Sequence, residues 1–94
     1  MSRQVLDIGA RYPEITGPFS DAFAAELNKA CAESDFTELV LDFSGTKIIS
    51  SMTMGTIFAV HQKLREQGKT IQIKNASDRV QHLFRMVNMT ELLL

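Results

Sequence analysis

The second half of this chain alternates between strand-like and helix-like segments, and this order strongly restricts the fold. Residues Glu38–Phe43 form an almost continuous apolar run, as expected of a strand that is covered on both faces. A helical spacing of apolar side chains follows over Met52–Gln67 and stops at Gly68, and Thr70–Lys74 then alternates between β-branched and polar residues. A further helix pattern begins after Ser77, a residue type that favours the capping position. The connection between the two strands is long enough for a right-handed crossover, which predicts that they are parallel.

The first half of the chain shows weaker patterns for two further strands and one further helix. Val5–Ile8 predicts a short strand, and Arg11–Thr16 predicts a second one in which Pro13 requires an edge position or a bulge. The break at Gly17-Pro18 starts a helix that continues to about Glu33, because Pro is favoured at the entry to a helix. The combined pattern predicts an α/β fold with a four- or five-stranded mixed sheet packed by about three or four helices.

Length and composition indicate one small domain over residues 1–94. The chain has 45% hydrophobic residues, enough for a single core, in which we expect Leu41, Phe58 and Phe84 to pack together. Its net charge is −1 and its Lys and Arg residues are scattered, so the composition excludes a basic face for nucleic acid. No apolar run approaches the roughly 20 residues of a membrane span, and we expect a cytoplasmic protein without membrane insertion. Cys31 is the single cysteine and is predicted to be a small core residue.

Two adjacent serines, Ser50 and Ser51, stand between the strand-like pair Ile48-Ile49 and the first turn of a helix. A hydroxyl at such a junction lies beside unpaired backbone N–H groups and the positive end of the helix dipole. It suits a helix cap, an anion site or a phosphorylatable switch. We expect Ser51 to be the N-cap, worth about 1 kcal/mol, although Ser50 can cap in its place. Met54 is predicted to lie in the core, whereas Met52, if exposed, offers a polarizable contact surface to a protein partner.

The order of these segments and several short motifs resemble the STAS domain, the family of bacterial anti-sigma factor antagonists. The segment Glu38–Gly45 is similar to the family's strand with its terminal Asp and small residues. Ile49–Gly55 lies where the family carries Asp-Ser-Ser-Gly-Leu-Gly, and Ala59–Gly68 resembles the family's helix and closing glycine. Ile71–Asn75 continues the register, and Ile15–Gly17 resembles the family's second strand and the glycine after it. The resemblance covers nearly the whole chain.

This resemblance implies a non-enzymatic module that binds an anti-sigma factor with a kinase-like ATP-binding fold and thereby releases a sigma factor. It assigns partner contact to Ser50, Ser51, Met52, Thr53 and Met54, and phosphorylation by the partner to Ser51, with Ser50 as the second candidate. Two residues depart from the family pattern, since Ser50 stands in place of the usual Asp and Thr53 in place of the usual Gly. These changes favour partner binding over phosphorylation as the retained role.

Other functions stay open. The same fold can serve as an accessory subunit of a transporter ATPase or as a scaffold in a signalling assembly, and a homodimer is also open. A small hydrolase with Ser51 as its nucleophile lacks a positioned base, because His61 lies on the inward stripe of its helix and His82 is predicted at the surface. Asp42 is expected to support the neighbouring loop through hydrogen bonds. The spacing of the two histidines matches no metal motif, the glycine-rich phosphate loops are missing, and we expect neither a cofactor nor a metal.

Overall fold

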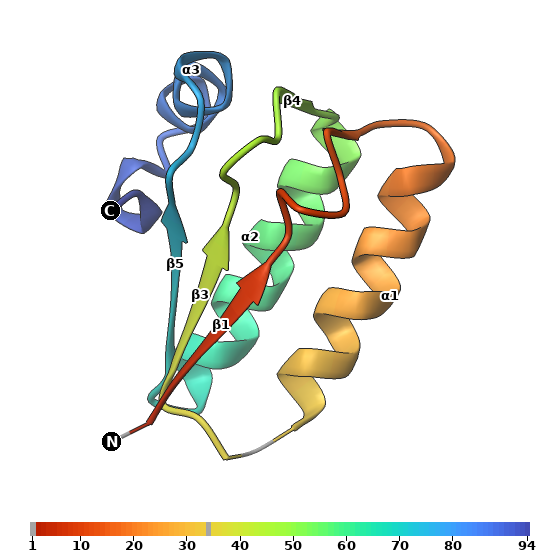
Figure 1. Ribbon diagram of the computed structural model, residues 1–94. Coiled ribbons are helices and arrows are strands. Elements are labelled where there is room, and N and C mark those ends of the chain that lie inside the picture. The colour runs from red at the N-terminus through yellow and green to blue at the C-terminus, as the bar shows by residue number, and fades with distance from the viewer. Residues whose placement is uncertain (1, 34) are drawn as a thin grey trace.

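Three parallel strands packed against two long helices dominate the architecture (Figure 1). The computed structural model describes residues 2–33 and 35–94. Helices α1 and α2 lie on one face of the sheet, and α3 follows the last strand at the carboxyl end of the sheet (Figure 1). In chain order the elements are β1 (Arg3–Asp7), β2 (Glu14–Ile15), α1 (Pro18–Ala32), β3 (Glu38–Asp42), β4 (Ile48–Ile49), α2 (Ser51–Glu66), β5 (Thr70–Lys74), α3 (Asp78–Met86) and the 3₁₀ turn η1 (Thr90–Leu92).

The strands form two separate parallel sheets. One sheet has the order β1-β3-β5, and the other pairs the two short strands β2 and β4. The predicted central strand and its parallel neighbour β5 are therefore confirmed. The predicted mixed sheet of four or five strands is wrong, because α1 and α2 each return the chain to the same end of the sheet, so all three long strands run in one direction. The predicted second strand shortens to the two residues of β2, which follow Pro13.

The core fills the space between the three-stranded sheet, helices α1 and α2, and the segment that contains α3 and η1. Leu41 and Phe84 are fully buried in one cluster, and Cys31 is buried with them, as predicted. The same expectation for Phe58 is wrong, because its side chain is 46% exposed. Ile57, one residue earlier, occupies the inward stripe of α2, and each step along a helix turns the side chain by about 100°.

The helix boundaries follow the predicted signals. Helix α1 begins at Pro18, and α2 ends two residues before Gly68, whose φ of 73° is the left-handed conformation expected after a helix. The hydroxyl of Ser77 accepts a hydrogen bond from the Val80 backbone N–H at 3.2 Å, which confirms the predicted cap of α3. No helix in the described part of the chain is both long and apolar enough to cross a membrane.

Candidate functional site

The two serines lie at the carboxyl end of the sheet, where β4 passes directly into α2. The Ser50 backbone N–H donates a hydrogen bond to the Ile15 carbonyl at 2.9 Å, so this point of the chain is fixed to β2. On the other side, the Ser77 hydroxyl donates to the Lys47 carbonyl at 3.2 Å, which joins β4 to the start of α3. The backbone that carries the serines is therefore held from two sides by residues far away in the sequence.

Ser50, and not Ser51, is the N-cap of α2. Its backbone is extended, with φ −80° and ψ 163°, and its hydroxyl accepts a hydrogen bond from the Thr53 backbone N–H at 3.1 Å. This is the geometry that satisfies one of the unpaired donors of a helix N-terminus. Ser51 is the first helical residue, so the prediction that it caps the helix is wrong and the alternative cap is confirmed.

Three hydroxyls meet behind the cap, and we call Ser20, Ser50 and Thr53 the hydroxyl cluster. The Ser50 oxygen lies 2.8 Å from the Ser20 oxygen and 3.0 Å from the Thr53 oxygen. The hydroxyls of Ser20 and Thr53 also reach the Ile15 carbonyl, at 3.4 and 3.3 Å. Ser20 and Thr53 are buried, and these bonds satisfy polar atoms that would otherwise be costly to remove from water.

Sequence reasoning did not single out Ser20, although a signal for it exists. Ser20 stands three residues before Phe23 and seven before Leu27, so it shares the inward stripe of α1. A small polar residue on such a stripe indicates a buried hydrogen-bond partner on a neighbouring element. The sequence does not reveal which partner that is, because Ser50 lies thirty residues away along the chain.

The five residues expected to contact a partner divide between the surface and the interior. Ser51 and Met52 are exposed, with 53% of Met52 accessible. Ser50 is half-buried, and Thr53 and Met54 are buried. Within the described residues the exposed Ser51 hydroxyl has no hydrogen-bond partner. The side chain of Thr53 is fully buried in the hydroxyl cluster, and contact between these five residues and a partner stays a prediction.

An apolar groove starts at Ser51 and runs between α2 and α3, and we call it the α2–α3 groove. Its volume is about 500 Å³. Phe58, Met86 and Val87 on its walls are 46%, 68% and 50% exposed, a concentration of accessible apolar surface that is typical of interaction sites. The residues that line it are Ser51, Met54, Gly55, Phe58, Leu83, Met86, Val87 and Met89. The groove was not predicted, because its two walls come from helices that only the tertiary fold brings together.

Asp42 supports the loops at the same end of the sheet, as expected. Its carboxylate accepts hydrogen bonds from the Ser44 backbone N–H at 3.0 Å and from the Asn75 side chain at 3.2 Å. The bond from Ser44 lowers the pKa of Asp42 below its ordinary value, and the Asn75 bond and the Lys74 charge act in the same direction against partial burial. Asp42 thus ties the loop after β3 to the turn after β5.

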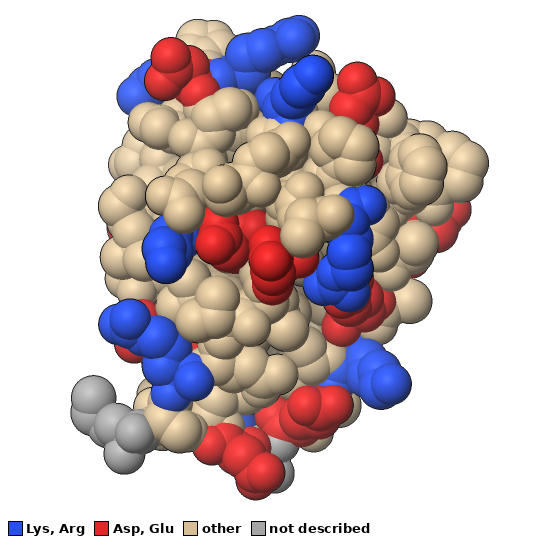
Figure 2. Space-filling view, viewed as in Figure 1, with Lys and Arg blue, Asp and Glu red and all other residues tan. Residues whose placement is uncertain are grey.

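The remaining polar groups form no catalytic or metal constellation in the described part of the chain. His61 is half-buried and His82 is exposed, as expected, and neither forms a hydrogen bond with Ser51 there. No group of three His, Cys, Asp or Glu side chains is placed to hold a metal ion among these residues. Over the sheet, charges of both signs are interspersed with uncharged side chains, so this face does not have the one-signed field that attracts nucleic acid (Figure 2).

Two comparisons with known proteins agree with this geometry. The profile of the family described as Mlab, STAS domain matches residues 13–94, which include the serines, the hydroxyl cluster and both walls of the groove. A solved structure of the anti-sigma factor antagonist SpoIIAA in its unphosphorylated form superposes with a TM-score of 0.78. That chain is 14% identical, and the match covers 98% of the present chain and 76% of the other, which shows a shared fold. Comparison with curated protein sequences gives no match.

Proposed function

This chain belongs to the STAS domain family, as its motifs predicted, and we propose that it is a non-enzymatic anti-sigma factor antagonist that acts in the cytoplasm. In this role it captures an anti-sigma factor with a kinase-like ATP-binding fold and so releases a sigma factor. The contact surface consists of the exposed residues Ser51 and Met52 together with the start of α2. Thr53 and Met54 are buried below this surface and support it indirectly, because they hold the first turn of α2 against the core.

The observation that carries this proposal is the position of Ser51. It is exposed, it is the first residue of α2, and it lies at the entrance of the α2–α3 groove. A partner that covers the groove must therefore also remove water from Ser51. The SpoIIAA likeness supports the same role at the level of the fold.

Phosphorylation of Ser51 is the proposed switch. The partner kinase transfers the γ-phosphoryl group of ATP to the Ser51 hydroxyl oxygen, ADP leaves and the hydroxyl proton is released. The phosphate adds a charge of about −1.5 to −2 at a helix N-terminus, where the backbone N–H groups and the dipole favour an anion, so the fold tolerates it. A partner that buries the same point must desolvate this charge, which weakens binding.

Ser51 is a better phosphoacceptor than Ser50 for a structural reason. The Ser50 hydroxyl holds the cap and two hydroxyls of the cluster, so its modification would break these bonds, whereas Ser51 has no such bond to lose in the described residues. An assay with the purified partner and ATP should therefore label Ser51 before Ser50, and mass spectrometry distinguishes the two sites. Labelling of Ser50 alone would contradict this assignment.

A pull-down with the intact chain tests the proposed partner class. The chain is immobilised, bound proteins are identified by mass spectrometry, and the experiment is repeated with Ser51→Asp. We expect an anti-sigma factor that is retained by the wild-type chain and depleted with Ser51→Asp. Recovery of a transporter ATPase instead, equally with both forms, would overturn the proposal. Reaction of Ser51 with a fluorophosphonate probe, lost in Ser51→Ala, would point to a hydrolase.

A further inference from the structure

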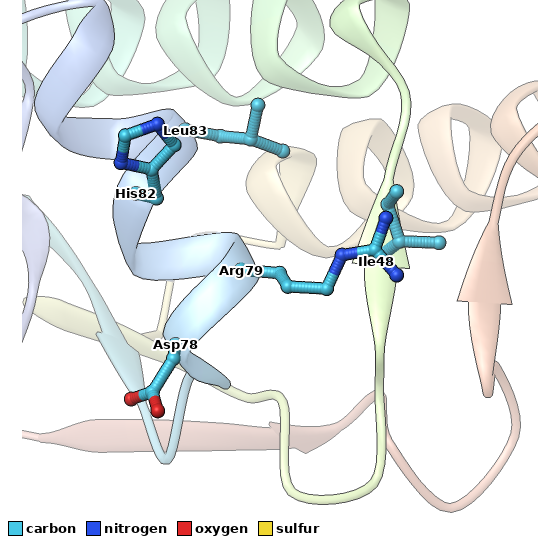
Figure 3. A pocket seen from close by; sticks show the side chains of 5 residues that line it. All are labelled: Ile48, Asp78, Arg79, His82 and Leu83. Carbon is cyan, nitrogen blue, oxygen red and sulfur yellow. The ribbon is translucent and has the colours of Figure 1, made fainter.

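The α2–α3 groove continues into a second hollow beside the start of α3. This hollow has a volume of about 370 Å³ and shares Leu83 with the groove. Its other lining residues are Ile48, Asp78, Arg79 and His82 (Figure 3). Because Ile48 belongs to β4, which leads into Ser50 and Ser51, the hollow lies at the same end of the groove as the serines. One continuous surface therefore joins the apolar walls to Arg79.

Arg79 is a cation without an anionic partner in residues 2–33 and 35–94. The ion pairs formed there join Arg3 to Glu38 and Arg11 to Glu26. The guanidinium of Arg79 extends from α3 toward Ile48, whereas the carboxylate of the preceding Asp78 points in another direction (Figure 3). The described residues that line the α2–α3 groove include no Asp or Glu. The surface thus combines an apolar trough with the Arg79 guanidinium at its end, and the Asp78 carboxylate in the same hollow points away from that guanidinium (Figure 3).

The walls of the groove also restrict the shape of what can cover it. They consist of α2, α3 and the residues Val87 and Met89 that follow α3, and the backbone groups of a helix interior are already paired within the helix. An added β-strand would find no ladder of free N–H and C=O groups there and would leave its own groups unpaired. A helix has its backbone bonds satisfied internally and presents side chains alone, which is the mode of recognition that suits an apolar trough. From Ser51 to Phe58 the groove follows about two turns of α2.

We propose that the α2–α3 groove receives an amphipathic helix of the partner, whose acidic side chain pairs with Arg79 while its apolar side chains, spaced i, i+3 or i+4 and i+7, pack against Phe58, Leu83 and Met86. This inference rests on the proposed function, since it names the segment of the partner that the Ser51 surface recognises. Arg79 fixes the direction of the bound helix, because only one orientation places its acidic residue at the Ser51 end of the groove.

A display selection with a defined probe tests this inference whatever the identity of the partner. The probe is a library of displayed helices of about 16 residues, with Leu, Ile, Met, Phe or Ala on one face and Glu, Gln or Lys at the flanking positions. The library is selected on the wild-type chain and, separately, on Arg79→Glu and Arg85→Glu. Arg85 is the matched control, because it lies on α3 about 120° around the helix from Arg79 and lines neither hollow.

We expect the wild-type chain to enrich helices with the stated apolar spacing and with Glu at one end. Selection on Arg79→Glu should replace that Glu by Lys, and selection on Arg85→Glu should retain it. The best helix should bind Met86→Glu and Arg79→Glu at least about tenfold more weakly, and Arg85→Glu and Val5→Glu within about twofold of wild type. Met86, Val5 and both arginines are exposed, so these variants keep the fold, which thermal unfolding verifies.

Several outcomes would overturn the inference. These are a lack of enriched helices, a charge preference that Arg79→Glu leaves unchanged, and helix binding that survives Met86→Glu. Sedimentation of the isolated chain provides a further test, because self-association that Met86→Glu abolishes would mean that a second copy covers the groove.

The two proposals fail in different ways. The partner obtained in the pull-down is measured against Ser51→Asp, Met86→Glu and Arg79→Glu in the same titration. A partner that responds to Ser51→Asp but not to the two groove variants contradicts the helix-in-groove inference and leaves the proposed function standing. The opposite result is also informative. If the selected helices bind the groove variants more weakly as expected, but the partner binds Ser51→Asp as tightly as the wild-type chain, the inference is supported and the proposed switch is contradicted.

Discussion

The hydroxyl oxygen of Ser20 on α1 lies 2.8 Å from the hydroxyl oxygen of Ser50, the cap of α2. This contact joins the first turn of α1 to the N-cap of α2, thirty residues further along the chain. Thr53 completes the cluster at 3.0 Å from Ser50. The two positions at which the sequence departs from the STAS motif, Ser50 and Thr53, are therefore hydrogen-bonded to each other.

Removal of the Ser50 hydroxyl should destabilise the domain. Ser50→Ala loses the cap of α2 and leaves the buried hydroxyls of Ser20 and Thr53 with fewer partners, at a cost of about 1–2 kcal/mol. Ser51→Ala is the control and should change the free energy of unfolding by less than about 0.5 kcal/mol, because Ser51 is exposed. Urea unfolding monitored by circular dichroism measures both. Equal losses in the two variants would show that Ser50 has no special structural role.

The hydroxyl cluster should behave as one unit. Ser20→Ala and Thr53→Val each remove one member, and after the first change the remaining hydroxyls have already lost part of their network. The double variant should therefore lose less stability than the sum of the single losses, by at least about 0.5 kcal/mol. A double-mutant cycle of unfolding free energies gives this coupling directly. Strict additivity would mean that the two side chains act independently.

Truncation of three apolar residues should distinguish core side chains from groove side chains by the stability that each variant loses. Leu41→Ala and Phe84→Ala should each cost about 2–5 kcal/mol, because both side chains are fully buried. Phe58→Ala should cost less than about 1 kcal/mol, since nearly half of its surface is exposed on the groove wall. Melting temperatures of the three variants test this division. A severe loss in Phe58→Ala would contradict the assignment of Phe58 to the groove.

Most of the fold could be predicted from the sequence, because its signals are local. The apolar run of β3, the alternation in β5 and the glycine after α2 each specify one element within a few residues. The division into two sheets could not be predicted in this way, since it depends on which strands pair and not on the pattern within each strand. Phe58 was misplaced for a related reason, because a helix between two others has more than one apolar stripe.

The candidate site was predictable only where the chain itself brings residues together. The serines stand side by side in the sequence, so their position at the start of α2 could be predicted, although the cap proved to be Ser50. Ser20 and the α3 wall of the groove come from segments far away along the chain. Their proximity follows from the packing of whole helices, which residue spacing does not encode.

Asp42 should contribute to stability in a pH-dependent way. Its pKa is lowered in the folded state, chiefly by the Ser44 backbone N–H, so the carboxylate stabilises the fold at pH above its ordinary pKa of 3.8. This contribution is lost as the pH falls through the lowered pKa. Asp42→Asn should therefore lower the free energy of unfolding at neutral pH. It should also make this free energy fall less steeply as the pH is lowered to about 2. Urea unfolding across this range, with the exposed Glu66→Gln as control, measures the effect. If the free energy of unfolding of Asp42→Asn fell with decreasing pH as steeply as that of the wild-type chain, the stabilising role of the Asp42 carboxylate would be contradicted.

Isothermal titration calorimetry of the purified partner against the wild-type chain, Ser51→Ala and Ser51→Asp measures whether the partner buries Ser51 in the complex. Aspartate at the first position of α2 is favoured by the helix dipole, so Ser51→Asp should fold normally. We expect Ser51→Asp to weaken binding at least about tenfold, or about 1.4 kcal/mol, because the complex must bury an unpaired charge at the groove entrance. Ser51→Ala should bind within about twofold of wild type. Equal affinities for all three forms would mean that Ser51 is a surface residue without a role in capture, which would overturn the proposed function.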